Sequence, residues 1–136
     1  MFGNNNNGQL GLGSTSNIGD GANEMGNYLS SINLGSGREV NEVKGGEFHT
    51  CAILDDFGLK CWGSNQFGQL GYGDTTYRGN AANHMGDYLP YINLGGLEVT
   101  TFSIQIGGMH SCAILFDNSM RCWGLKPYLL LLCFDI

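Results

Sequence analysis

Residues 46–63 read Gly-Glu-Phe-His-Thr-Cys-Ala-Ile-Leu-Asp-Asp-Phe-Gly-Leu-Lys-Cys-Trp-Gly, and a closely similar pattern returns at residues 107–124. Cys51 and Cys112 are 61 positions apart, and so are Cys61 and Cys122. A stretch that repeats at a fixed spacing is typical of a structural unit that the chain uses more than once. We therefore treat this stretch as the unit that decides the fold.

The stretch predicts a hairpin of two antiparallel strands, because short apolar runs with β-branched residues flank a polar turn. A three-residue loop over 55–57 closes on Leu54 and Gly58 and places Cys51 opposite Cys61. The same count places the second cysteine pair, Cys112 and Cys122, opposite each other.

The last loop residue of this hairpin type needs a positive φ. Asn118 in the second copy tolerates that conformation, whereas Phe57 in the first copy does not adopt it easily. We therefore expect the first turn to be distorted or slipped.

Side chains alternate between the two faces of a hairpin, and both faces are largely apolar. One face carries His49, Cys51, Ile53, Leu59 and Cys61, and the other carries Thr50, Ala52, Leu54, Lys60 and Trp62. A hairpin of this kind must be covered on both sides, which a stack of sheets achieves.

The composition agrees with a small all-β domain rich in turns. The 136 residues include 23 glycines and 2 prolines, and only 13% of them are charged. The net charge is −6 with six scattered Lys and Arg residues, so we expect no direct contact with nucleic acid. The longest apolar run, 128–134, is too short to span a membrane.

A second alignment of the chain with itself extends the repeat. Residues 2–13 match 62–73 at an offset of 60. We therefore divide the chain into a first repeat at 2–62, a second repeat at 63–124 and a non-matching apolar tail at 125–136. Short strands near 91–94 and over 99–106 precede the second hairpin, giving about four strands per repeat. The expected fold is all-β, a partial β-propeller with two blades of about four antiparallel strands each.

These repeats resemble those of the regulator of chromosome condensation family. The likeness rests on Trp62-Gly63, Asn65, Gly68-Gln69-Leu70-Gly71 and Gly73, on Pro90-x-Ile92-x-Leu94, and on Val40-x-x-Val43-x-x-Gly46-x-x-His49-Thr50-x-Ala52-x-Leu54. The resemblance implies a seven-bladed propeller. The structural blade motif comprises Trp62, Gly63, Gly68, Leu70, Gly71, His49, His110, Trp123 and Gly124. Ser30 and Phe2 depart from the proline and tryptophan of the pattern.

Two repeats do not close a ring of seven, so we expect a fragment of a longer propeller. The alternative is that several copies assemble to complete a ring. On either hypothesis the missing blades come from the parent chain or from self-association.

The cysteines leave two interpretations open. The register places Cys51 beside Cys61 and Cys112 beside Cys122 in non-hydrogen-bonded pairs, close enough for a cross-strand disulfide. Because no secretory signal is visible, we favour buried free thiols. Cys133 has no matching partner in the repeats.

The remaining motifs indicate structural roles and no metal binding, cofactor binding or catalysis. His-x-Cys followed by a cysteine ten positions later does not match zinc spacing, so we expect no metal and no cofactor. His49 and His110, with Thr50 and Ser111, are expected to hydrogen-bond to neighbouring backbone and lock one blade to the next. The glycines of 68–73 are interpreted as tight turns, and residues 4–7, four asparagines, as a floppy terminus. No catalytic carboxylate pair is supported, so the chain is not expected to be an enzyme.

We predict a non-catalytic module for protein–protein interaction, with the long loops 14–31 and 74–91 as the binding surface for an unidentified protein partner. One alternative is part of a guanine-nucleotide exchange factor for a small GTPase, as the resemblance implies for some relatives. Another is a disulfide-bonded extracellular repeat protein. The absence of a signal peptide favours the cytoplasm or nucleus. The ultraviolet-B receptors of the family carry Gly-Trp-Arg-His-Thr, whereas the Trp position here holds Glu47 or Gly108, which argues against photoreception.

Overall fold

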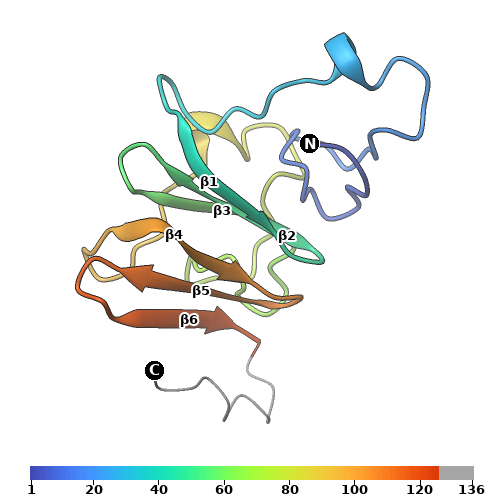
Figure 1. Cartoon of the computed structure of the whole chain (residues 1–136). Coiled ribbons are helices and arrows are strands. Elements are labelled where there is room, and N and C mark those ends of the chain that lie inside the picture. Colours follow the sequence, from blue (N-terminus) through green and yellow to red (C-terminus); the bar gives the residue numbers. More distant parts are fainter. Residues whose placement is uncertain (126–136) are drawn as a thin grey trace.

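The chain forms two antiparallel sheets that lie one above the other (Figure 1). The computed structural model describes residues 1–125. The first sheet consists of β1 (Val40–Gly45), β2 (His49–Leu54) and β3 (Leu59–Gly63), and the second of β4 (Val99–Ile106), β5 (His110–Leu115) and β6 (Met120–Gly124). Two 3₁₀ turns, η1 (Gly26–Tyr28) and η2 (Gly86–Tyr88), lie in the long loops. No helix among the described residues has the length and hydropathy that crossing a membrane requires.

The prediction of an all-β, partial propeller is confirmed, but each sheet has three strands rather than about four. Residues 91–94 are not a strand. Their contact with β3 includes one hydrogen bond, from the Ile92 amide to the Leu59 carbonyl at 2.9 Å. Pro90 has no N–H to add to a ladder. The Asn93 side chain then accepts from the Gly95 amide at 2.9 Å and turns the chain away.

The predicted hairpin register is confirmed in both copies, with Cys51 opposite Cys61 and Cys112 opposite Cys122. The first turn is not slipped, contrary to expectation. Phe57 adopts φ 61°, and its amide donates to the Leu54 carbonyl at 3.0 Å. The Phe57 ring packs edge-on against Phe116 of the other hairpin, with centroids 5.3 Å apart. This contact between the two turns helps to offset the energetic cost of placing Phe57 in the left-handed region of backbone conformation.

The two faces of the first hairpin belong to two hydrophobic clusters, as the alternation predicted. The face with Cys51, Ile53 and Leu59 packs against the second sheet, where Val99 and Ile104 of β4 are buried. The opposite face joins a cluster that consists of Leu34, Ala52, Leu54, Trp62 and Leu89. The hairpin is therefore covered on both sides, by the second sheet on one and by the long loops on the other.

Both cysteine pairs form disulfides, which corrects the preference for free thiols. The Cα atoms are 4.0 Å apart for Cys51–Cys61 and 4.1 Å apart for Cys112–Cys122. The hairpin register places the two cysteines of each pair directly opposite each other. The preference for free thiols rested on the reducing compartment inferred from the lack of a secretory signal, and the structure does not follow that inference. The first disulfide is fully buried between the sheets, whereas Cys122 of the second is exposed.

The two disulfides provide a matched comparison of stability. Each spans a separation of 10 residues, so each should stabilise the fold by about 3 kcal/mol through loop closure. The Cys51→Ala/Cys61→Ala variant also opens a buried gap and should lose about 1 kcal/mol more than Cys112→Ala/Cys122→Ala. Urea unfolding of the oxidised proteins measures the difference.

A thiol count on the denatured, unreduced protein serves as the control. It should find at most one thiol per chain, because four of the five cysteines are in disulfides and the fifth, Cys133, lies outside the described residues. Five thiols, or equal losses of stability in the two double variants, would contradict this description.

Candidate interaction surface

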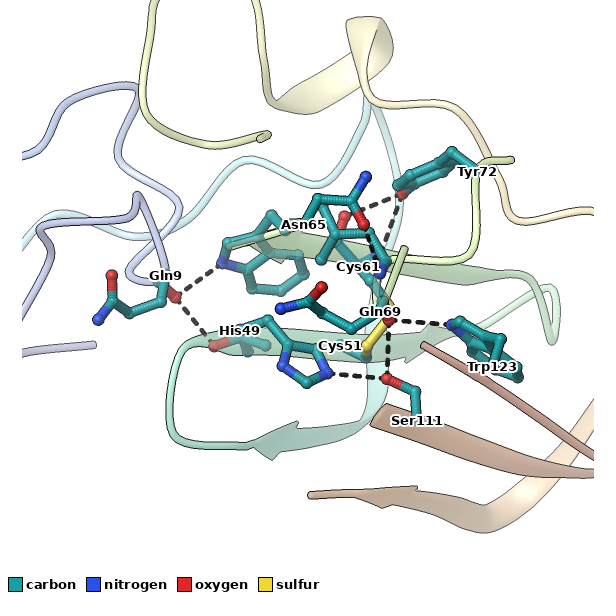
Figure 2. Close-up of a disulfide and its surroundings, with 12 residues drawn as sticks. Gln9, His49, Cys51, Cys61, Asn65, Gln69, Tyr72, Ser111 and Trp123 are labelled. Carbon is teal, nitrogen blue, oxygen red and sulfur yellow. Dashed lines mark hydrogen bonds between the residues drawn. A yellow bond between two sulfur atoms is a disulfide. The ribbon is translucent and has the colours of Figure 1, made fainter. Parts of the chain in front are cut away.

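In each repeat, two side chains of the hairpin donate hydrogen bonds to one main-chain carbonyl of a preceding loop (Figure 2). The Gln69 carbonyl accepts from Trp123 Nε1 at 3.0 Å and from Ser111 Oγ at 2.9 Å. In the first repeat, the Gln9 carbonyl accepts from Trp62 Nε1 at 3.0 Å and from Thr50 Oγ1 at 2.9 Å. The hydroxyl side chains thus bond to backbone, as predicted, and hold the glycine-rich loops on the hairpins.

The loop glycines of the motif make this approach feasible. A Cβ on Gly71 would lie 2.7 Å from Trp123 Nε1, and one on Gly11 would lie 2.7 Å from Trp62 Nε1. Both glycines also have positive φ, 82° and 71°. A side chain at either position would push the indole away from the carbonyl that it binds.

His49 lies between the two sheets rather than bonding to backbone as expected. Its Nε2 is 2.8 Å from Ser111 Oγ, and the Ser111 hydroxyl donates its proton to Gln69. Nε2 must therefore donate, and no described residue binds Nδ1. Burial, with the neighbouring His110 as a second cause, lowers the pKa of His49 from 6.5 to about 4. His110 is only partly buried.

One asparagine in each repeat folds the polar loop that follows it. Asn65 Nδ2 donates to the Asp74 and Thr76 carbonyls at 2.9 and 3.0 Å, and its Oδ1 accepts from the Leu70 amide at 2.9 Å. Asn5 makes the corresponding bonds in the first repeat. Asn5 has no exposed surface, so interpreting residues 4–7 as a floppy terminus was wrong.

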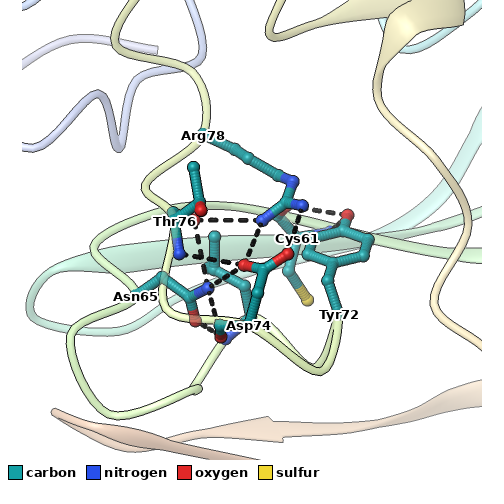
Figure 3. A network of polar contacts seen from close by, with 7 residues as sticks. Cys61, Asn65, Tyr72, Asp74, Thr76 and Arg78 are labelled. Atoms are coloured by element: carbon teal, nitrogen blue, oxygen red, sulfur yellow. Dashed lines mark hydrogen bonds and ion pairs between the residues drawn. The ribbon is translucent and has the colours of Figure 1, made fainter.

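The second repeat adds a charged network on this framework (Figure 3). The Arg78 guanidinium binds both carboxylate oxygens of Asp74, at 3.0 and 2.9 Å, and lies 4.1 Å from the centroid of the Tyr72 ring. The bond from Arg78 lowers the pKa of Asp74 to about 2. The Tyr72 hydroxyl accepts from the Cys61 amide at 3.1 Å and donates to the Cys61 carbonyl at 3.0 Å. Burial raises the pKa of Tyr72.

The two long loops are joined to each other by a buried lysine. Lys60 Nζ donates to the Leu34 carbonyl at 2.7 Å and to the Gly86 carbonyl at 3.0 Å. Burial lowers the pKa of this amine. Asp87 accepts from the Ser36 amide at 2.9 Å and from the Ser36 hydroxyl at 2.6 Å. The loops are therefore held in a fixed relation before any partner binds.

Between the loops lies an open groove with a volume of about 550 Å³. Residues 11–13 form one part of its lining, residues 30–33 a second and residues 81–88 a third. Tyr88 lines the groove and is 71% exposed, whereas Tyr28, which is 68% exposed, is not part of the lining. The two tyrosines occupy equivalent positions in η1 and η2.

One carboxylate, Asp87, lies on the lining of the groove, and the two long loops carry more acidic than basic side chains. Residues 14–31 and 74–91 contain four carboxylates, Asp20, Glu24, Asp74 and Asp87, and one Lys or Arg residue, Arg78, which is paired with Asp74. Glu24 binds the Gly19 and Gly21 amides, and these bonds lower its pKa. Asp20 and Glu24 form no salt bridge among the described residues, whereas the pKa of Asp87 is lowered by its bonds from Ser36 and by the Lys60 ammonium.

The structural blade motif collects at the junctions between sheets and loops and not at the groove. Leu70 is buried in the core between the sheets, and Gly63 and Gly124 end β3 and β6 with positive φ. No cluster of three His, Cys, Asp or Glu residues that could hold a metal occurs in residues 1–125. The groove, in contrast, lies between loops 14–31 and 74–91, the segments that the sequence indicated as the binding surface.

The buried His49 predicts an acid-sensitive fold. Because its folded pKa of about 4 lies below the ordinary 6.5, the unfolded chain binds the proton first as the pH falls. Stability should be greatest above pH ~6.5 and should decrease by up to ~3 kcal/mol towards pH ~4.

Urea titrations over this range should show a shallower pH dependence for His49→Gln than for the wild type. His84→Gln, a partly exposed histidine in loop 74–91, serves as the matched control. An unchanged slope in His49→Gln would contradict the assignment.

The comparisons with known proteins agree with this architecture. The model of the regulator of chromosome condensation (RCC1) repeat matches residues 40–69. The ultraviolet-B receptor UVR8 of Arabidopsis thaliana is 38% identical over 129 residues, which cover 93% of this chain and 25% of the receptor. The chain thus spans about a quarter of the length of this curated relative.

Solved structures share the fold. Human WBSCR16 matches with a TM-score of 0.64 at 19% identity, over 90% of this chain and 28% of that one. Prp20p of Saccharomyces cerevisiae, whose structure is described together with its binding to Gsp1p and histones, matches with a TM-score of 0.57 at 21% identity, over the same shares. With its glycine-rich loops, Trp–carbonyl bonds and stacked sheets, the chain carries the regulator of chromosome condensation repeat at residues 40–69 and is similar to UVR8 along 93% of its length.

Proposed function

We propose that this chain is a non-catalytic propeller-repeat module that binds a basic segment of a partner protein in the groove between loops 14–31 and 74–91. The observation that carries the proposal is an exposed aromatic side chain, Tyr88, on the lining of an open groove of about 550 Å³. Repeats 2–62 and 63–124 both contribute to the lining, and the second repeat supplies the tyrosine.

The groove has the physical character of a protein-binding site. Tyrosine offers a large contact area with few rotatable bonds, and it is enriched at protein interfaces. The bonds of Lys60 and Asp87 hold the two loops together, so little conformational entropy is lost when a partner binds. The net charge of −6, with Asp87 on the lining, favours a partner of positive charge.

The relatives support the choice of probe. Prp20p, which shares the fold, is described as binding histones, and these are basic proteins. We do not propose light sensing by analogy with UVR8. The Trp and Arg positions of the receptor motif hold Glu47 and Phe48 in one repeat and Gly108 and Met109 in the other.

Calorimetric titration with a purified core-histone dimer tests the proposal. The wild type should bind, and the Tyr88→Ser variant should lose ~10-fold or more in affinity because the aromatic anchor of the groove is removed. Phe67→Ser, which changes an aromatic residue outside the groove, is the matched control and should bind as the wild type does. Equal binding by the tyrosine variant would count against the groove.

Guanine-nucleotide exchange is the second candidate, and the described binding of Prp20p to Gsp1p is the observation that favours it. Release of a fluorescent nucleotide from a Ran-type GTPase measures it directly. On the proposal above, adding the chain should leave the release rate unchanged. A rate that rises in proportion to the protein concentration would replace binding by exchange as the function.

An intracellular location is part of the proposal, since the chain shares its repeat with RCC1-type proteins. The two disulfides are the feature of an extracellular repeat protein. Thiol counts on the protein isolated from cells, with alkylation at lysis, separate the two. Reduced thiols at all four positions in cells would support the intracellular assignment, with the disulfides forming only after the protein leaves the reducing compartment, and intact disulfides in cells would favour the extracellular one.

A further inference from the structure

The molecule carries two exposed surfaces that match the two halves of its own internal interface. Val40 and Val43 on β1 pair with Leu54 and Ala52, just as Val99 and Ile104 on β4 pair with Leu115 and Ala113. The residues on β4 are buried against the first sheet, at 1% and 0% exposure, whereas Val40 and Val43 are 49% and 51% exposed. We call the exposed surface of Val40 and Val43 the leading face.

The second sheet shows the complementary difference. Ile53 and Leu59, on the face that the second sheet covers, are 0% and 1% exposed. The residues that occupy the same register in the second hairpin, Ile114 and Met120, are 43% and 52% exposed. We call this surface, which includes the exposed disulfide of Cys112 and Cys122, the trailing face.

Contact between these two kinds of face already occurs once within the chain. There, β4 packs against β1 and β2, and the apolar cluster between the sheets contains residues from both partners. Because the repeats share register and disulfide positions, the trailing face has the shape and chemistry that the leading face needs.

We propose that a second copy of this chain docks by placing its leading face on the trailing face of the first. The contact is heterologous, since the two surfaces differ, so each dimer keeps one free face of each kind. Further copies add in the same direction until a ring closes or a filament forms. The proposal is independent of the groove, which lies between the long loops.

Analytical ultracentrifugation of the full chain tests this arrangement. The wild type should show oligomers that grow with concentration, at up to ~100 µM for a contact of modest affinity. Ile114→Glu on the trailing face and Val43→Glu on the leading face should each be monomeric. Both positions are about half exposed, so circular dichroism should show both variants folded.

The decisive measurement mixes the two variants in equal amounts. Ile114→Glu retains an intact leading face and Val43→Glu an intact trailing face, so the mixture should form a dimer and stop there. Tyr28→Glu, an exposed residue on neither face, should associate as the wild type does. Isologous association or non-specific hydrophobic association would not give this pattern.

Three results would overturn the proposal: a monomeric wild type at every concentration, oligomers unaffected by either substitution, or a mixture that stays monomeric. A monomer would mean that a further repeat or another segment of the chain covers the trailing face, or that it remains open. Reduction of Cys112–Cys122 provides an independent readout. Its rate should decrease as the protein concentration rises, because docking buries that disulfide.

Discussion

The fold depends on hairpins that are apolar on both faces. Such a hairpin is stable only when something covers each face, because exposed apolar area costs roughly 25 cal/mol per Å². In the first hairpin the second sheet covers Cys51 and Ile53, and the long loops cover Ala52 and Leu54. This requirement explains why sheets and loops alternate along the molecule, and why the loops are ordered although they contain little regular structure.

The polar bonds at each junction make that packing specific. A single main-chain carbonyl accepts one bond from an indole and one from a hydroxyl, both on the hairpin that it covers. Buried donors of this kind must be paired, so a hairpin that slipped by one residue would leave both unpaired. A hydrogen bond between His49 and Ser111 links the two sheets in the same way. Apolar burial thus drives the stacking, and these hydrogen bonds fix its register.

The sequence was sufficient to predict the hairpin register, because loop length and side-chain alternation determine which residues face each other. It was insufficient where tertiary contacts outweighed local preference. Phe57 adopts a positive φ with its ring against Phe116, a residue 59 positions away in the chain. The expected strand at 91–94 fails because Pro90 and Asn93 favour a turn over a ladder.

Two other features show what the repeat pattern could have revealed. The match of Asn5 with Asn65, at the same offset of 60 as its neighbours, indicated an ordered residue within the asparagine run. For Lys60, no pattern could have predicted its bonds to Leu34 and Gly86, because both acceptors are backbone carbonyls of distant loops. That the loops form the variable surface for a protein partner stays a prediction. The groove between them depends on that lysine and could not be predicted.

Comparison of the two repeats distinguishes the bonds that maintain the fold from the features that belong to one loop only. The asparagine, glutamine and tryptophan bonds occur in both copies, whereas the Asp74–Arg78 pair has Ser14 and Ile18 at the corresponding positions of the first. This bidentate pair, which stacks on Tyr72, sets the shape and charge of one loop only. Stability therefore constrains the shared bonds, while the loops remain free to vary in charge and contact residues. Recognition of a partner is expected to reside in those loops, since changes there leave the packing of the sheets intact.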